Sequence, residues 1–203
     1  MQQEILYAIV VALIGYVLGS LSFSTILGKV FENTDIRDHG SGNAGATNTL
    51  RVLGKKTAAA VLLGDILKCL AAVLIGNMFV PVYGGWIAGI CCMLGHVYPV
   101  FFGFKGGKGV ATGIALMVFV QPFAGLSALL LFVIILIICK IVSVSSLCAF
   151  LVFPITVWLF TKEPLFVIIA CAMFLFVAFL HRENIKRLFK GEEKKISFKS
   201  VKK

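Results

Sequence analysis

The stretch IRDHGSGNAGATNTLRVLG, residues Ile36–Gly54, decides how this chain is organised. It is the first polar interruption in an otherwise apolar sequence, and its glycines stand among Ser, Asn and Thr residues just before Arg51. Glycine lets the backbone approach a ligand closely, and consecutive exposed N–H groups form a concavity that binds anions. A nearby arginine adds a two-pronged donor that matches phosphate or carboxylate oxygens. The stretch therefore predicts an anion pocket, with an ordinary loop between helices as the alternative.

Residues Gly40–Gly45 also match the pattern G-x-G-x-x-G of dinucleotide-binding folds. That fingerprint needs a preceding β-strand and a βαβ unit. Here a long apolar helical run precedes the glycines and another follows them. We therefore reject a dinucleotide site.

The composition predicts an all-α integral membrane protein. The chain has 203 residues, is 60% hydrophobic and has a mean hydropathy of +1.02, far above the values of a soluble domain. The start of the sequence lacks the basic region of a cleaved signal peptide, so the first apolar run is expected to be retained. We expect one integral-membrane domain, residues 1–203, with about seven transmembrane helices. They are expected at about residues 5–30, 57–76, 80–97, 110–120, 123–138, up to 160, and 165–180.

The distribution of basic residues predicts how the helices are oriented in the membrane. The loops after the first, third, fifth and seventh apolar runs contain nearly all of the loop lysines and arginines, whereas the opposite loops contain only Lys162. The positive-inside rule then places the N-terminus outside and the C-terminus in the cytoplasm. Every polar, glycine-rich motif falls on the same cytoplasmic side, as expected for a composite site at the membrane surface. The basic residues on that side are Arg37, Arg51, Lys55, Lys56, Lys105, Lys108, Lys140, Arg182, Lys186 and Arg187.

The net charge of +10 could suit nucleic acid, anionic lipid or an anionic substrate. Nucleic acid is not expected, because the charges lie in short loops between apolar runs. All six cysteines lie in or beside apolar runs without metal-site spacing, so we expect neither disulfides nor a metal. Gly15 and Gly19 have the G-x-x-x-G spacing of closely packed helices.

A second polar interruption, GHVYPVFFGFKGGKGVATG, spans residues Gly95–Gly113. It resembles a nucleotide-binding P-loop only superficially, because Phe102 stands where that motif needs its first glycine and Gly109 follows the lysine. Lys105 and Lys108 on a glycine-rich turn still predict a phosphate clamp. Positive-inside topology alone is the alternative, although it does not explain the clustered glycines.

Two further sets of polar residues leave alternatives open. Asp65 and Lys68 share one face of an apolar helix, either as a buried structural ion pair or as support for the anion site. The segment HRENIKRLFKGEEKK begins at residue 181 and has apolar residues at helical spacing. We expect residues 181–203 to form a cytoplasmic interfacial helix and a basic tail. From the residues alone, His181, Asn184 and Glu193 are more simply interfacial than catalytic.

Together these motifs resemble a known family. GSGNAGATNTLR, GHVYPVFFGFKGGKG and HRENIKRLFKGEE are similar, in order, to three signature motifs of the bacterial acyl-phosphate:glycerol-3-phosphate acyltransferases. DILK in the second apolar run and the serine turn after Lys140 extend the resemblance over nearly the whole chain. The family pattern near the C-terminus is close to G-T-E. This chain has Gly191-Glu192-Glu193, so Glu193 takes the matching position.

The resemblance implies a seven-helix membrane enzyme without a cofactor that acylates the 1-hydroxyl of sn-glycerol 3-phosphate from a fatty acyl phosphate, in phospholipid synthesis. It implies a bacterial cytoplasmic (inner) membrane location, a cytoplasmic active site, contact with membrane lipid and dependence on an enzyme that supplies acyl phosphate. The implied catalytic residues are Ser41, Arg51, Lys108, His181, Asn184 and Glu193. The implied substrate-binding residues are Gly40, Gly42, Asn43, Thr47, Asn48, His96, Lys105, Gly106, Gly107, Gly109, Ser143 and Ser146.

Such chemistry fits the residue inventory, because an acyl phosphate is already activated and the enzyme must hold two anions and spread negative charge. The sequence has no evident Ser-His-Asp arrangement. We expect a substrate phosphate oxygen to accept the hydroxyl proton, with His181 as the other candidate base. The rival interpretations are an organic-phosphate transporter or exchanger, which would also use broken helices and cationic loops, and a lipid-binding scaffold.

Overall fold

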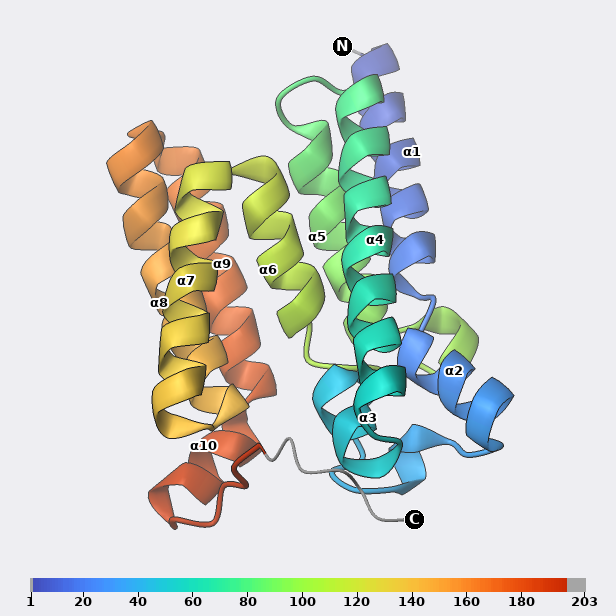
Figure 1. Ribbon diagram of the computed structural model, residues 1–203. Coiled ribbons are helices and arrows are strands. Elements are labelled where there is room, and N and C mark those ends of the chain that lie inside the picture. The colour runs from blue at the N-terminus through green and yellow to red at the C-terminus, as the bar shows by residue number, and fades with distance from the viewer. Residues whose placement is uncertain (1, 197–203) are drawn as a thin grey trace. The chain divides into compact units, whose positions relative to one another are not determined.

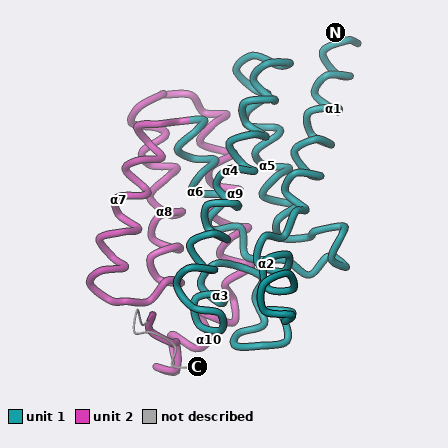
Figure 2. Tube along the Cα trace, turned by 45° about the vertical axis from the view of Figure 1, so that its right-hand side comes forward, with its two compact units in different colours: residues 1–120, 198–203 teal, residues 121–197 magenta. Residues whose placement is uncertain are grey.

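The computed structural model describes residues 2–196, and this part of the chain is helical without a β-strand. The expected basic tail lies partly outside it, because residues 197–203 are not described. The absence of a strand before Gly40 agrees with the rejection of a dinucleotide fold. The described residues divide into two compact units, residues 2–120 and 121–196, which Figure 2 distinguishes by colour.

Unit 1 is built around three apolar helices that pack against one another, α1, α4 and α5, with α6 packed on α4 and α5 (Figure 1). Its core side chains include Val11, Val61, Ala72 and Leu116, all fully buried. Its elements are α1 (Gln2–Gly19), α2 (Phe23–Glu32), the 3₁₀ turn η1 (Ile36–Asp38), α3 (Ala46–Val52), α4 (Lys55–Phe79), α5 (Gly84–Val97), the 3₁₀ turn η2 (Val100–Phe102) and α6 (Val110–Val120).

The predicted G-x-x-x-G contact is confirmed on α1. A Cβ atom added at Gly15 would overlap the backbone of Ala88, and one at Gly19 would overlap the backbone of Cys92. Both neighbours lie on α5. Small residues therefore let these two helix backbones touch, which is the usual basis of close helix packing in a membrane.

The first predicted span, residues 5–30, is not one continuous helix. The structure breaks it after Gly19 and begins α2 at Phe23, with Ser22 as the residue before the new helix. Ser22 and Ser24 are buried and bonded locally, because the Ser22 Oγ lies 2.9 Å from the Thr25 Oγ1. The apolar composition continues across the break, so periodicity alone does not reveal it.

Unit 2 has three long apolar helices followed by a short one: α7 (Pro122–Cys139), α8 (Val142–Thr161), α9 (Pro164–Leu180) and α10 (Arg182–Phe189). α8 packs against both α7 and α9. Phe150, Phe153, Val157 and Val177 are fully buried in the core of this unit. The helix expected after residue 181 is present as α10, which is bent by 62° from α9.

Five helical segments are long and apolar enough to cross a bilayer, and a sixth results if α9 and α10 count as one bent span. Large apolar side chains cover their outer faces, as lipid contact requires. α6 has only 11 residues, about 16 Å of helix against a hydrocarbon core of about 30 Å. The chain is thus a multi-pass helical membrane protein, and α6 is too short to cross alone.

Candidate functional site

The first glycine loop, residues 39–45, joins η1 to α3. Gly40 and Gly42 have positive φ angles of +66° and +72°, which residues with a side chain rarely adopt. The exposed Ser41 is held between these two turns. α3 has only seven residues, so its dipole is small and the loop N–H groups with nearby cations must provide most of the positive potential.

The buried side chain of Asn48 holds the backbone of this loop through hydrogen bonds. Its Nδ2 donates to the carbonyl oxygens of Ile36 and His39, each at 3.0 Å. Its Oδ1 accepts from the Ser41 backbone N–H at 2.8 Å. A Cβ atom at Gly40 would overlap this amide. Asn48, predicted as a substrate contact, thus has its amide hydrogens and its oxygen engaged in shaping the loop that carries Ser41.

The second glycine loop, residues 103–109, leads from η2 into α6. It folds back on the last turn of α5, because the Gly107 N–H donates to the His96 carbonyl at 3.0 Å and the Gly106 N–H to the Val97 carbonyl at 3.1 Å. These carbonyls would otherwise be unpaired at the end of the helix. The fold of this loop therefore depends on where α5 ends.

The two loops touch each other. The Ala44 N–H of the first loop donates to the Gly106 carbonyl of the second at 3.4 Å, and a Cβ atom at Gly107 would lie 2.7 Å from the Ala44 carbonyl oxygen. Motifs about sixty residues apart in the sequence are thus brought together, as the prediction of one site requires. Only glycine fits at this contact.

Arg37, which sequence analysis used only as a topology marker, joins the same two segments. Its guanidinium pairs with Asp35 through two hydrogen bonds of 2.9 and 2.8 Å, and its Nη1 donates to the carbonyl oxygens of Phe102 at 2.6 Å and Lys105 at 3.4 Å. The hydrogen bonds from Arg37 hold the pKa of Asp35 well below its usual range. We call these contacts of Arg37 with Asp35, Phe102 and Lys105 the Arg37 clasp. The spacing Asp35-x-Arg37 before a glycine-rich loop is the sequence signal that could have indicated it.

Beside this clasp lies an open hollow of about 640 Å³. Its lining brings together two residues of the predicted site, Gly42 and Lys105, but does not include Ser41, Arg51 or Lys108. The lining residues are Lys29, Arg37, Asp38, Gly42, Phe101, Phe102, Gly103 and Lys105.

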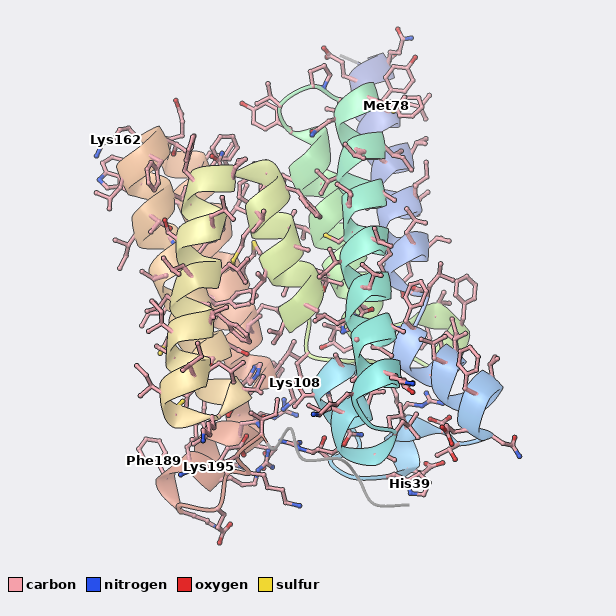
Figure 3. All side chains as sticks on the ribbon, viewed as in Figure 1. His39, Met78, Lys108, Lys162, Phe189 and Lys195 are labelled. Carbon is pink, nitrogen blue, oxygen red and sulfur yellow. The ribbon has the colours of Figure 1, made fainter. Side chains whose placement is uncertain are left out.

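The predicted cations of unit 1 gather at its polar end. Figure 3 shows Lys108 at the same end of this unit as His39 and opposite Met78. Arg51 is half-buried on α3 and makes no hydrogen bond or ion pair with any residue between 2 and 196. Beside a glycine loop, an arginine whose donors are not used by the described part of the chain is well placed to bind an anion. Asn43 and Thr47 are half-buried in the same loop and helix.

His96 is placed behind the loops rather than on the surface. Its side chain is buried, and its Nδ1 lies 3.1 Å from the Nζ of Lys68 and 3.3 Å from the Oδ1 of Asp65. Lys68 and Asp65 form an ion pair of 2.8 Å inside the unit. The structure thus contains the buried ion pair that the sequence suggested, and adds a histidine that had been predicted as a substrate contact.

In unit 2, Asn184 of the third motif and Ser143 both contact Glu193. Its carboxylate accepts hydrogen bonds from Ser143 at 2.8 Å, Asn184 at 2.6 Å and Arg187 at 2.7 Å. Burial raises the pKa of Glu193, but the hydrogen bonds from Asn184, Arg187 and Ser143 outweigh it and hold the pKa below its ordinary value. Glu193 is therefore the centre of a clasp that fastens α10 to the start of α8; its partner Arg187 was not predicted.

His181 lies at the junction of α9 and α10 and is buried. Its Nδ1 is 2.8 Å from the Val177 carbonyl oxygen, which can only accept, so the ring nitrogen donates there. In the neutral imidazole the basic nitrogen is then Nε2. Ser146 is fully buried and donates to the Val142 carbonyl of its own helix at 2.8 Å.

The structure holds no group of three His, Cys, Asp or Glu residues between positions 2 and 196 that could ligate a metal. All six cysteines lie in that part of the chain and are free thiols.

Apolar spanning helices and contacting glycine loops at one polar end define a multi-pass membrane protein with a candidate anion site. The family model described as glycerol-3-phosphate acyltransferase matches residues 9–191, and the chain belongs to this family. Among curated relatives, the glycerol-3-phosphate acyltransferase of Thermoanaerobacter sp. (strain X514) is 42% identical over 96% of this chain and 98% of its own length. That of Clostridioides difficile (strain 630) is 41% identical over 97% and 98%.

Two solved structures have the same fold. They are crystal structures of PlsY (YgiH), described as an integral membrane glycerol 3-phosphate acyltransferase, in a glycerol 3-phosphate form and a lysophosphatidic acid form. Their TM-scores are 0.86 and 0.83, at 34% and 33% identity. Each match covers 94% of this chain and 96% of the solved chain.

Proposed function

We propose that this protein transfers a fatty acyl group from an acyl phosphate to the 1-hydroxyl of sn-glycerol 3-phosphate. The products are 1-acyl-glycerol 3-phosphate (lysophosphatidic acid) and inorganic phosphate. The observation that carries the proposal is family membership along nearly the whole chain, from residue 9 to residue 191. The solved relatives in glycerol 3-phosphate and lysophosphatidic acid forms correspond to the acceptor and the product of this reaction.

In the proposed step, the glycerol hydroxyl oxygen attacks the acyl carbon and forms a new ester bond. The anhydride C–O bond breaks, and phosphate leaves with the electron pair. The hydroxyl proton goes to a phosphate oxygen or, in the other version, to Nε2 of His181. Because the leaving group is already good, binding two anions and stabilising the charge that develops are the main tasks.

The polar end of unit 1 supports this assignment. Arg51 and Lys108 bring positive charge, and the first glycine loop presents the exposed Ser41. Lys105, with Gly42, lines the open hollow. We assign the anionic parts of the substrates to these groups and to the loop N–H groups, and Asn48 to shaping the loop. In unit 2 we propose catalytic roles for His181 and Asn184, with Glu193 orienting Asn184 and Ser143 donating to Glu193. Ser146 remains a proposed substrate contact.

We further propose seven membrane-embedded segments with the N-terminus outside, the C-terminus in the cytoplasm and the site facing the cytoplasm of a bacterial inner membrane. The one-sided distribution of lysine and arginine supports this orientation. The short α6 counts as an embedded segment that does not cross by itself. The donor would come from a separate enzyme that makes acyl phosphate.

The decisive assay uses purified protein in detergent, labelled glycerol 3-phosphate and either palmitoyl phosphate or palmitoyl-CoA. Lysophosphatidic acid and released phosphate are followed together. Product from the acyl phosphate alone is expected. Product from the CoA ester alone would keep the acyltransferase but overturn the donor. No product from folded protein would contradict the enzyme and lead to a liposome uptake assay for a transporter.

A further inference from the structure

Three ionisable side chains lie buried together between α4 and α5 of unit 1. Asp65, Lys68 and His96 have exposed fractions of 1%, 4% and 6%. Ionisable groups within a membrane-embedded bundle are costly, and burying a charge pair is seldom the best route to stability. α4 and α5 are already held closely by the contact between Gly76 and Gly84. We therefore infer that these three side chains do more than hold α4 and α5 together.

Lys68 is the centre of the cluster. Its Nζ donates to the Leu21 carbonyl at 2.8 Å, in the break between α1 and α2, and lies 2.8 Å from Oδ1 of Asp65 and 3.1 Å from Nδ1 of His96. The contact with Asp65 is ionic without hydrogen-bond geometry, since that oxygen accepts no hydrogen bond from residues 2–196. The same Nδ1 of His96 is 3.3 Å from Oδ1 of Asp65, so the imidazole lies within reach of both charged groups.

The far side of the same imidazole faces the second glycine loop. A Cβ atom at Gly107 would overlap Nε2 of His96 and would also lie 2.7 Å from the Ala44 carbonyl oxygen. The backbone carbonyl of His96 accepts from the Gly107 N–H at 3.0 Å. His96 thus contacts the loop through both its backbone and its ring, at the point where the two glycine loops meet.

We propose that Asp65, Lys68 and His96 form a positioning network that braces the Gly106–Gly107 turn and so presents Lys108 to the phosphate of glycerol 3-phosphate. Hydrogen bonds and ion pairs fix direction as well as distance, whereas apolar packing alone would let a glycine-rich turn move. A turn held in its binding geometry loses less entropy when the substrate binds. The proposal rests on the proposed function, because it deepens the role of the same loops.

The test uses two variants in the full-length protein. His96→Ala removes the brace next to the loop. The double variant Asp65→Asn/Lys68→Met removes the charges farther away without leaving one buried charge unpaired. Each is expected to raise KM for glycerol 3-phosphate by about 10-fold, while kcat changes by less than about 3-fold. Hydrogen–deuterium exchange of the amides of residues 103–109 is expected to become faster in both.

Asn77→Ala is the matched control, because Asn77 joins α4 to α5 near the other end of these helices. Its Oδ1 accepts from the Gly85 N–H at 2.8 Å. This variant is expected to lower the midpoint of thermal unfolding but to keep the wild-type KM and loop exchange. A folded test variant with wild-type KM and loop exchange would overturn the proposal, as would an equal rise in KM for Asn77→Ala. Loop exchange is measured without substrate, so it tests the brace even if the wild-type protein fails to acylate glycerol 3-phosphate.

Discussion

Arg51 is the residue of unit 1 whose lack of a bonded partner among residues 2–196 points most clearly to ligand binding. Other cations in unit 1 have structural duties, since Arg37 is bound by Asp35 and Lys68 by Asp65. Arg51 has no such partner among the described residues. A guanidinium that is left unpaired beside a glycine loop keeps its donors for a ligand, and charge-assisted bonds to phosphate are among the strongest that a protein makes.

We predict that Arg51→Ala lowers kcat/KM for glycerol 3-phosphate acylation by at least about 100-fold, because bonds to a charged group are each worth about 1.5–3 kcal/mol. Its thermal unfolding midpoint should change little, because the side chain makes no hydrogen bond or ion pair with residues 2–196. Lys56→Ala is the control: it removes one exposed positive charge nearby on α4 and should cost less than about 3-fold. Equal losses in the two variants would mean that only the general positive field matters.

At the scale of elements, helix length explains where the loops lie. α4 has 25 residues, about 37 Å of helix, whereas α5 has 14 and α6 has 11, about 21 and 16 Å. α5 therefore ends, and α6 begins, well short of the beginning of α4. About 21 Å of α4 separates Asp65 from Phe79, so Asp65 reaches the level at which α5 ends. The part of α4 beyond it is covered by α2 and α3.

The hydrogen bonds of Glu193, which fasten α10 to the start of α8, should make the stability of this contact depend on pH. The pKa of Glu193 in the folded protein is lower than its ordinary value of 4.5. Its contribution to stability is thus fully present above about pH 4.5 and is lost as the pH falls through the lowered pKa. The carboxylate is largely buried, with 7% of the side chain exposed, and protonation removes the charge that Arg187 and Asn184 bind.

We predict that the thermal unfolding midpoint of the wild-type protein falls more steeply between about pH 5 and pH 3 than that of Glu193→Gln. At neutral pH this variant should unfold at a lower temperature and should lose activity, because Asn184 is no longer held by a carboxylate. Glu192→Gln changes the exposed neighbour and should follow the wild-type curve. Parallel curves for all three proteins would exclude Glu193 as the group that titrates.

The features that depend on residues close together in the sequence were predicted correctly. Apolar runs predicted the helices of both units, and the glycine spacing on α1 predicted its contact with α5. The break at Ser20–Ser22 was missed because the carbonyl of Leu21 is satisfied by Lys68, 47 positions later. The inward roles of Asn48 and His96 also depend on partners that no spacing reveals. The glycine loops were predicted as sites, but their mutual contact required the fold.

At the scale of the molecule, nearly all loop lysines and arginines follow alternate apolar runs of the sequence, which is the pattern from which the orientation is proposed. In unit 2, Figure 3 shows Phe189 and Lys195 at the end opposite Lys162. The exposed Phe189 projects apolar surface beside basic residues, as expected where a helix meets lipid headgroups. The ammonium of Lys162 lies over the ring of Trp158. Such a tryptophan near a helix end is typical of a membrane interface.

We predict that Lys162 faces the outside and Lys195 the cytoplasm. With the six native cysteines replaced by serine or alanine, Lys162→Cys in intact cells should react with a membrane-impermeant maleimide, whereas Lys195→Cys should react only after permeabilisation. The two positions lie at opposite ends of the same unit, so each variant serves as the control for the other. Replacing a loop lysine removes a topology signal, so acylation activity of each variant must confirm that the orientation is kept. Labelling of Lys195→Cys from outside in active protein would reverse the orientation and place the third motif on the wrong side for a cytoplasmic substrate.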